Sequence, residues 1–346
     1  MRLLAILTVR NEAAFLLDWL AHHRAVGFTD FLVFSNDCQD GTDEMLDRLH
    51  DMGQVEHIRN DGPYDKRGIQ FTALKKAEQL NIVKQADWIL PLDVDEFVNV
   101  HVGDRSVPAL IAALPEATAI TLTWRLFGNA GQVEYQDRPV PEIFTAAAPV
   151  VMYWPWRSAM FKTLYRNDGT YRKVGVHRPR NPRPERVDSA RWFDGEGREL
   201  DGQFRTRRIF SNYGRSNYAL AQLNHYPLGA MQSYVLKADR GRAVHSDDML
   251  GLDYWVERNF CTEEDRSILA MAERVAPIRA GLGQDAELAR LHDEAVAWRL
   301  TRFDELMKEE PFRALFGRLL MTPPSTPLGL KDAHVLLRHA TAARMS

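Results

Sequence analysis

Cysteine is scarce in this sequence, and long apolar runs are absent from it. Of its 346 residues only Cys38 and Cys261 are cysteines, which excludes a disulfide framework and a cysteine-rich zinc site and suits a reducing compartment. No apolar run approaches the roughly 18 residues that span a bilayer. Residues 1–9 are apolar but soon followed by charges, a pattern typical of a first strand rather than of a signal peptide. We therefore expect a cytoplasmic protein, and peripheral contact with the inner membrane face is compatible with the sequence.

Glycine-rich phosphate loops and a strong charge of one sign are also missing. No G-x-G-x-x-G follows the first expected strand and no Walker loop occurs, which disfavours dinucleotide dehydrogenases and P-loop enzymes. The net charge of −3 argues against nucleic-acid binding. The hydrophobic content of 45% and charged content of 26% are ordinary for a soluble globular protein. The length suits one large α/β domain with an appendage, or two domains.

Strand-like and helix-like segments alternate through the first quarter of the chain. Strands are expected at residues 3–7, 31–34, 54–58 and 87–92, and the segments between them have the spacing of amphipathic helices. Asn11 and Thr42 are suited to cap the first two helices. This order predicts an α/β fold with a doubly wound, mainly parallel sheet. Ligands of such sheets bind at the carboxyl ends of the strands.

Three acids, Asp93, Asp95 and Glu96, directly follow the fourth expected strand. Carboxylates are costly to bury unless they are paired or bound to a cation. Residues i and i+2 of an extended chain project to the same side, so Asp93 and Asp95 can converge on one divalent ion. The alternative interpretation is a solvated turn, because Asp-x-Asp is a common pair.

A series of short motifs occurs in a fixed order around these acids. The motif residues are Arg10-Asn11-Glu12, Asp18-Trp19, His22-His23, Gly27, Asn36, Cys38, Asp40-Gly41-Thr42, Gln70, Asp93-Val94-Asp95-Glu96-Phe97, Trp124, Phe127-Gly128, Gly131, His225-Tyr226, Ser233, Lys237 and Arg240-Gly241. Over about residues 1–245 the chain thereby resembles the family 2-type glycosyltransferases of GT-A fold, in a bacterial branch. Cys38 departs from that pattern, which has serine at this place.

The resemblance implies a GT-A fold, a Rossmann-like doubly wound sheet with a C-terminal helical extension. We expect residues 1–130 to form the nucleotide-sugar-binding α/β half. Residues 131–260 would form the half of the same catalytic domain that holds the acceptor and completes the metal site. Residues 261–346 would be a helical region, beginning with a capping box at Thr262 and Asp265.

The resemblance also implies a divalent cation, which stabilises a departing nucleoside diphosphate by neutralising its charge. Asp95 is the expected direct ligand, and Asp93 would be shared between the metal and the ribose or sugar of the donor. His225 is the expected third ligand, although it could equally be a core histidine bonded to the backbone, and His177 competes with it. Mn²⁺ or Mg²⁺ suits oxygen-rich ligands better than zinc does.

Donor contacts are expected from the strand ends, from the start of the third helix, whose N-terminus favours anions, and from the segment after His-Tyr. The candidates are Thr8, Arg10, Glu12, Asn36, Asp37, Arg67, Gln70, Asp93, Lys237 and Arg240. Lys237 and Arg240 would contact the diphosphate by resemblance. Asp37 could instead serve the loop alone, and for Thr42 a capping role is favoured over ligand contact.

A catalytic base is needed if the anomeric centre inverts, as it mostly does in the resembling family. Glu134 is one candidate, and Asp253 and Glu257 are others. The spacing selects none of them, and each could be a solvated surface acid.

The expected function is metal-dependent transfer of a sugar from a nucleoside-diphosphate donor, of UDP or GDP type, to a polysaccharide or glycolipid-type acceptor. The alternative is a non-catalytic homologue that binds a nucleotide or carbohydrate. A haloacid-dehalogenase-type phosphatase is disfavoured because its nucleophilic Asp follows the first strand, whereas these acids follow the fourth. The basic, proline-containing stretch 157–215 is expected to be irregular. It would be either an electropositive lid that covers the diphosphate or an anionic acceptor, or a solvated loop without a ligand.

Overall fold

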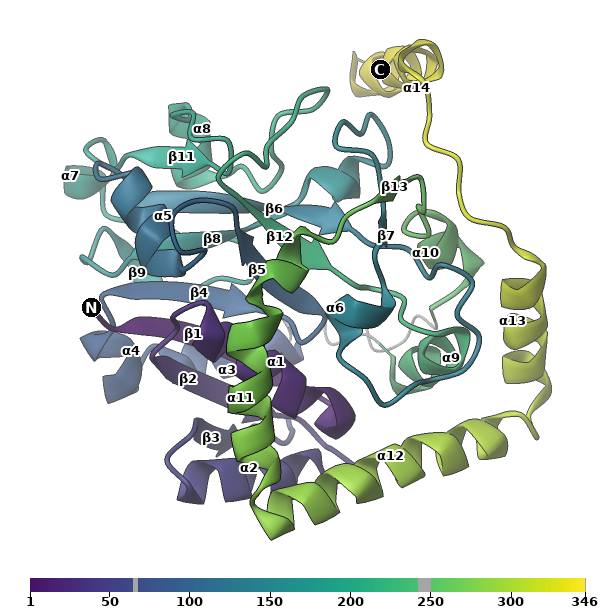
Figure 1. Cartoon of the computed structure of the whole chain (residues 1–346). Coiled ribbons are helices and arrows are strands. Elements are labelled where there is room, and N and C mark those ends of the chain that lie inside the picture. The colour runs from purple at the N-terminus through teal and green to yellow at the C-terminus, as the bar shows by residue number, and fades with distance from the viewer. Residues whose placement is uncertain (65–67, 242–249, 346) are drawn as a thin grey trace.

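One mixed sheet forms the centre of the protein, in a computed structural model that describes residues 1–64, 68–241 and 250–345 (Figure 1). Its strand order is β3-β2-β1-β4-β8-β6-β12-β5, with β11 beside β6. The strands are β1 (Leu3–Val9), β2 (Asp30–Ser35), β3 (Glu56–Arg59), β4 (Trp88–Leu92), β5 (Glu96–Val100), β6 (Ala119–Leu126), β8 (Phe161–Arg166), β11 (Trp192–Asp194) and β12 (Ala221–His225).

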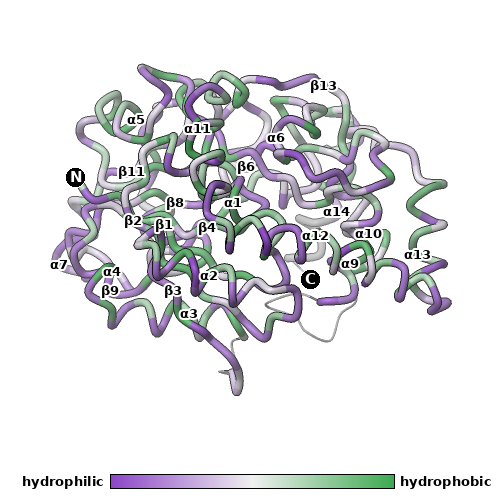
Figure 2. The backbone as a smooth tube through the Cα atoms, turned by 60° about the horizontal axis from the view of Figure 1, so that its bottom comes forward, coloured by the Kyte–Doolittle hydropathy of each residue, from purple (hydrophilic) through white to green (hydrophobic). Residues whose placement is uncertain are grey.

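The first four strands are parallel to one another, as the sequence predicts. The helices between them are α1 (Ala13–Ala25), α2 (Thr42–Asp51), α3 (Ile69–Ala77) and α4 (Asn81–Gln85). Leu3, Ala5 and Leu7 of β1 belong to one apolar cluster, whereas Leu4 and Ile6 belong to another. Strands buried on both faces read as continuous apolar runs, and Figure 2 shows such residues along β1 and β4. The predicted α/β class with a mainly parallel sheet is confirmed.

The second part of the sheet contains antiparallel strands that the sequence did not reveal. β8 lies between β4 and β6 and runs antiparallel to both, so the stretch 157–215 is not wholly irregular as expected. β5 starts directly after the acidic turn and pairs antiparallel with β12. Within this pairing Glu96 lies opposite His225, which brings the acidic turn next to the His-Tyr motif.

The first two helices begin at a shared hydrogen-bond network rather than at the predicted caps. The side chain of Asn11 makes no cap and instead accepts from the Gln39 N–H at 2.8 Å. Asp40 Oδ2 accepts from the Ala13 N–H, and its Oδ1 accepts from the N–H of Thr42, both at 3.0 Å. One buried carboxylate thus satisfies the amino ends of α1 and α2 and holds residues 10–12 near the strand ends.

The C-terminal region is helical, as predicted, and packs against the catalytic half. α11 (Ala272–Gly283) lies on α1, and α12 (Ala286–Leu306) contacts α2 and α9 (Met231–Arg240). α13 (Glu310–Met321) lies on α9, whereas α14 (Leu330–Met345) stands apart at the end of an extended segment (Figure 1). The expected capping box at Thr262 and Asp265 is wrong, because a short strand and a 3-10 turn occupy this stretch.

The remaining elements are short and connect the sheet to these helices. They are α5 (Val107–Ala113), α6 (Val140–Ile143), β7 (Ala146–Ala147), η1 (Trp156–Ala159), β9 (Tyr171–Lys173), β10 (Arg180–Pro182), α7 (Pro184–Val187), α8 (Gly202–Thr206), α10 (Leu252–Val256), β13 (Glu263–Glu264) and η2 (Ser267–Met271). No helix in the described ranges has the length and apolar character needed to cross a membrane. The expected boundaries at residues 130 and 260 stay predictions, and β12 lies between β6 and β5, so the first two parts share one sheet.

A pair of buried histidines in α1 makes stability depend on pH. His22 Nε2 donates to the Val98 carbonyl at 2.8 Å, and burial lowers the pKa of His22 to about 4 from an ordinary 6.5. Because only the unfolded chain takes up this proton between those values, stability is full above pH 6.5 and falls as the pH drops to 4. The free energy of unfolding should fall between pH 7 and pH 4.5, and we expect this fall to be about 3 kcal/mol smaller in His22→Gln than in the wild-type protein. Urea unfolding at the two pH values measures it. A matching effect of the exposed His334→Gln would contradict the assignment.

Candidate active site

The acidic turn between β4 and β5 is organised by the fully buried Glu96. Its Oε2 accepts from the Asp93 N–H at 2.9 Å, and its Oε1 accepts from the Trp124 indole N–H at 2.6 Å. Burial raises the pKa of Glu96 to about 8, although the neighbouring Lys162 ammonium acts in the opposite direction. Glu96 therefore shapes the turn and leaves Asp93 and Asp95 to face the cavity described below.

Asp93 is held by one side chain from β8 and one from α3. Its Oδ2 accepts from the Lys162 ammonium and its Oδ1 from the Gln70 amide, both at 2.9 Å. Lys162 is 1% exposed and lies also 3.5 Å from the Glu96 carboxylate. Lys162 is not predictable from the sequence, because only the pairing of β8 with β4 brings it to the acidic turn.

Asp95 meets His225 and Lys237 at the other side of the turn. Lys237 Nζ donates to Asp95 Oδ2 at 2.7 Å, and His225 Nε2 lies 3.8 Å from Asp95 Oδ1. Burial by itself raises the pKa of Asp95, but the Lys237 ammonium and His225 outweigh it and hold that pKa well below its usual range. Burial lowers the pKa of His225, so its imidazole is neutral near pH 7.

A second buried ion pair joins Glu12 to Arg240. Arg240 contacts the Glu12 carboxylate and also donates to the Arg10 carbonyl at 2.6 Å. Burial raises the pKa of Glu12, although the Arg240 guanidinium acts against it. Arg240 and Lys237 both come from α9, so this helix delivers two cations to the carboxyl ends of β1 and β4.

Most of these groups line one cavity of about 620 Å³, beneath which Glu96 and Lys162 are buried. The predicted site residues on its wall are Thr8, Arg10, Glu12, Asn36, Gln70, Asp93, Asp95, His225, Lys237 and Arg240. His177, which also lines it, hydrogen-bonds the Phe161 carbonyl through Nδ1 at 3.0 Å. The amide of Asn36 is committed to the Val9 and Phe34 carbonyls and to Asn60, so it joins strand ends.

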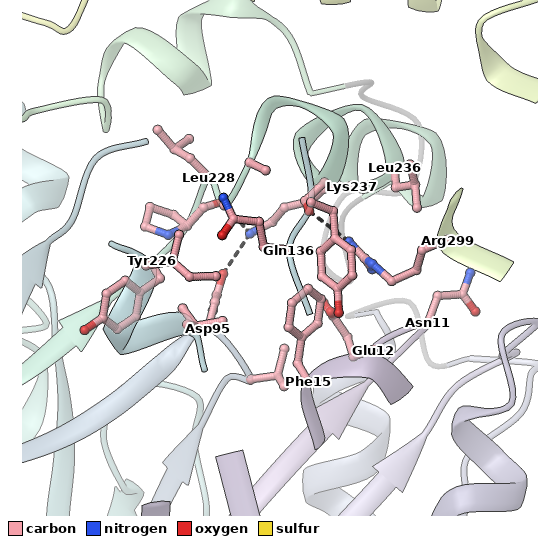
Figure 3. Close-up of a pocket in the computed structure, with 18 of the residues that line it drawn as sticks. Asn11, Glu12, Phe15, Asp95, Gln136, Tyr226, Leu228, Leu236, Lys237 and Arg299 are labelled. Carbon is pink, nitrogen blue, oxygen red and sulfur yellow. Dashed lines mark hydrogen bonds and ion pairs between the residues drawn. The ribbon is translucent and has the colours of Figure 1, made fainter. Parts of the chain in front are cut away.

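Three predicted residues fall elsewhere. Arg67 lies outside the described residues. Asp37 is not among the residues that line the cavity and accepts a hydrogen bond from the Tyr64 hydroxyl. Glu134 lines a smaller pocket of about 80 Å³, which shares Asp95 and Lys237 with the large cavity (Figure 3).

The predicted metal ligands Asp95 and His225 lie on the wall of this cavity. Within the described part of the chain, no three His, Cys, Asp or Glu side chains are grouped to hold a metal ion. Asp95 and the neutral His225 nevertheless lie together, and His225 Nδ1 is buried without a hydrogen-bond partner in that part. Hard cations of this kind are often bound by one or two protein groups together with substrate phosphates. The residues present therefore fit a cation whose coordination a bound diphosphate completes.

Comparison with known proteins finds glycosyltransferases. No protein-family model matches the chain. A glycosyltransferase family 92 protein of Oryza sativa subsp. japonica is 24% identical over 149 residues, which are 41% of this chain and 24% of the rice protein. The chain thus matches about a quarter of that relative's length.

Two solved structures are similar over different shares of the chain. S. aureus TarS 1–349 in complex with UDP-GlcNAc is 15% identical, with a TM-score of 0.34 over 88% of this chain and 84% of that one. The galactosyltransferase LgtC in complex with donor and acceptor sugar analogs is 16% identical, with a TM-score of 0.22 over 34% of this chain and 46% of that one.

The buried Lys162 ammonium balances the negative charge of the acidic turn, and replacing Lys162 tests this role. We expect Lys162→Met to lower the free energy of unfolding by about 3 kcal/mol at pH 7, because the Asp93 carboxylate loses its buried counter-charge. Urea denaturation followed by tryptophan fluorescence measures the change. Lys173→Met, at an exposed position in β9, serves as the matched control. Equal stability of the two variants would show that Lys162 does not balance these acids.

Proposed function

We propose that this protein is a glycosyltransferase of GT-A fold that moves a sugar from a nucleoside-diphosphate donor to a saccharide or glycolipid-type acceptor. The observation that carries the proposal is the cavity at the ends of β1 and β4, which gathers most of the residues selected from the motifs. The rice relative is a glycosyltransferase by name, in agreement with it.

The donor lies along this cavity in the proposal. The nucleoside rests near Thr8 and Asn36, at the ends of β1 and β2, and the diphosphate lies against Lys237 and Arg240. Both cations are paired with carboxylates, Asp95 and Glu12, and can exchange these partners for phosphate oxygens. The proposed donor is a UDP sugar or a GDP sugar, and the binding experiment below distinguishes the two.

Asp95 and His225 would hold Mn²⁺ or Mg²⁺, with Asp93 close to the donor sugar. The cation supplies charge neutralisation on the departing diphosphate. Lys237 and Arg240 add fixed positive charge at the same oxygens. Asp93 stays oriented by Lys162 and Gln70, so its carboxylate is already in place when the donor arrives.

An inverting reaction needs a base that accepts the proton of the acceptor hydroxyl. We propose Glu134 for this role, since its pocket shares a wall with the large cavity. Asp253 lines neither pocket, and Glu257 is paired with Arg157 and Arg258. A non-catalytic homologue is the alternative, and it would bind nucleotide without turnover.

Calorimetry of UDP and GDP with and without Mn²⁺ tests the donor site. We expect one nucleotide to bind in a metal-dependent way, and Asp95→Asn to weaken that binding at least about tenfold (~1.4 kcal/mol). Mn²⁺ alone should bind weakly, because the described part of the chain supplies few of the ligands. Asp51→Asn, at an exposed position, is the control.

Failure of both nucleotides to bind the folded protein with Mn²⁺ present would overturn the transferase proposal. Binding without hydrolysis of the matching nucleotide sugar, and without transfer, would favour the non-catalytic homologue. Donor turnover that Glu134→Gln leaves unchanged would remove Glu134 as the base.

We further propose that α14 contacts an anionic membrane surface. Leu330 and Leu336 are 50% and 37% exposed, and with Ala333 they follow the spacing of one helix face. Lys331 and Arg338 fall on another face of the helix. An isolated helix of 16 residues is marginally stable in water, and its basic and apolar faces together suit a bilayer interface.

Sedimentation with phosphatidylcholine vesicles, with or without phosphatidylglycerol, tests this contact. We expect the protein to bind only the anionic vesicles, less so at high salt, and Lys331→Glu with Arg338→Glu to abolish binding. Arg290→Glu, on the exposed face of α12, is the control. A chain that stays in the supernatant, or that uses α14 to form dimers, would overturn this assignment.

A further inference from the structure

The wall of the large cavity carries cationic groups that the proposed donor site does not include. The cationic side chains on the cavity wall are Arg10, Arg157, Lys237, Arg240 and Arg258. Of these, Arg157 and Arg258 come from η1 and from the segment after α10, and neither belongs to the motifs found in the sequence. Arg258 also lies beyond the stretch that the family resemblance covers.

Arg258 is rigidly held at the inner wall. Its side chain is 6% exposed, and its guanidinium carbon lies 3.6 Å from the centre of the Tyr254 ring. Nη1 donates to the Tyr254 carbonyl at 3.2 Å. A guanidinium stacked in this way keeps its plane fixed, which prepares it for bidentate binding of a carboxylate or phosphate.

The charge of Arg157 and Arg258 is not balanced. Glu257 lies 3.8 Å from Arg157 and 3.6 Å from Arg258, beyond hydrogen-bond distance of either. Among the described residues this one carboxylate serves both arginines, whereas Lys237 and Arg240 each have a carboxylate of their own. Counting the described residues alone, one unit of positive charge is therefore in excess where Arg157 and Arg258 face the cavity.

The Tyr254 ring contacts both Arg258 and Lys237 and so connects the excess charge with the proposed diphosphate site. Lys237 Nζ, which is assigned to the diphosphate, lies 5.8 Å from the centre of the same ring. A group bound at Arg258 is thus about one aromatic ring away from the leaving group. The acceptor must approach the transferred sugar from such a neighbouring position.

We infer that Arg157 and Arg258 form a subsite for an anionic acceptor, a saccharide or glycolipid headgroup that carries a carboxylate or phosphate. The inference rests on the proposed function, because it takes the part of the cavity around Lys237 as the donor site. Arg258 supplies the fixed guanidinium, and Arg157, whose side chain is 60% exposed, closes on the anion from the cavity mouth. Binding of the anion satisfies the positive charge that Glu257 leaves over.

Matched pairs of charged and neutral probes test the subsite in the full-length protein. Saturation-transfer NMR, with the bound nucleotide and Mn²⁺ present, compares methyl glucuronide with methyl glucoside and glycerol 3-phosphate with glycerol. We expect at least one anionic member to bind about tenfold more tightly than its neutral partner. Arg258→Gln and Arg157→Gln should each abolish the preference and change nucleotide affinity less than twofold, whereas Arg290→Gln should change neither.

Several results would overturn the subsite. A wild-type protein that binds neither anionic probe, or prefers neither to its neutral partner, lacks it. A tenfold loss of nucleotide affinity in the Arg258→Gln protein would assign the arginine to the donor instead. Because Arg157 is exposed, Arg157→Gln keeps the test valid if the Arg258 variant does not fold. Failure of the proposed function itself shows separately, as absence of UDP and GDP binding to the wild-type protein.

Discussion

Compensation of buried carboxylates at the end of β4 is the constraint on which the rest of the site depends. Asp93, Asp95 and Glu96 come from one turn, yet their counter-charges come from β8 and α9, which lie far along the chain. A carboxylate without such a partner would be costly to bury, so the turn is stable only when both elements are docked. The antiparallel strands β8 and β12 are therefore as necessary to the site as the parallel strands that precede it.

The same ion pairs suit the exchange that the proposed reaction needs. Lys237 and Arg240 are held by Asp95 and Glu12, which balances the charge of these two cations before a ligand binds. A diphosphate and a divalent cation arriving together bring charges that largely cancel. Lys237 can then turn to phosphate and Asp95 to the metal without leaving a buried charge unpaired. The two pockets meet at this wall, so movement of these side chains affects both.

The C-terminal helices support the site from behind, outside the stretch that the motifs cover. Arg299 of α12 is buried, lies 4.5 Å from the Phe15 ring centre and 5.0 Å from that of Tyr135, and donates to Ser233 on α9. It thereby joins α1, α9 and the segment before α6, which all contribute residues to the smaller pocket. Arg279 of α11 pairs with Asp18 in α1. These contacts fix the helix that starts beside Glu12.

Local patterns in the sequence were sufficient for the first four strands and their helices, because apolar periodicity and turn residues act within a few positions. Motif spacing also selected Asp95, His225 and Lys237, which the structure brings together. Lys162, the Glu96 contact with Trp124 and the capping role of Asp40 were not predictable, since each joins segments far apart in the chain. The sequence by itself determined the parallel half of the sheet and the position of three acids in the turn after β4. Only the tertiary structure decided which charges face one another, because that depends on the antiparallel strands and on the docking of α9.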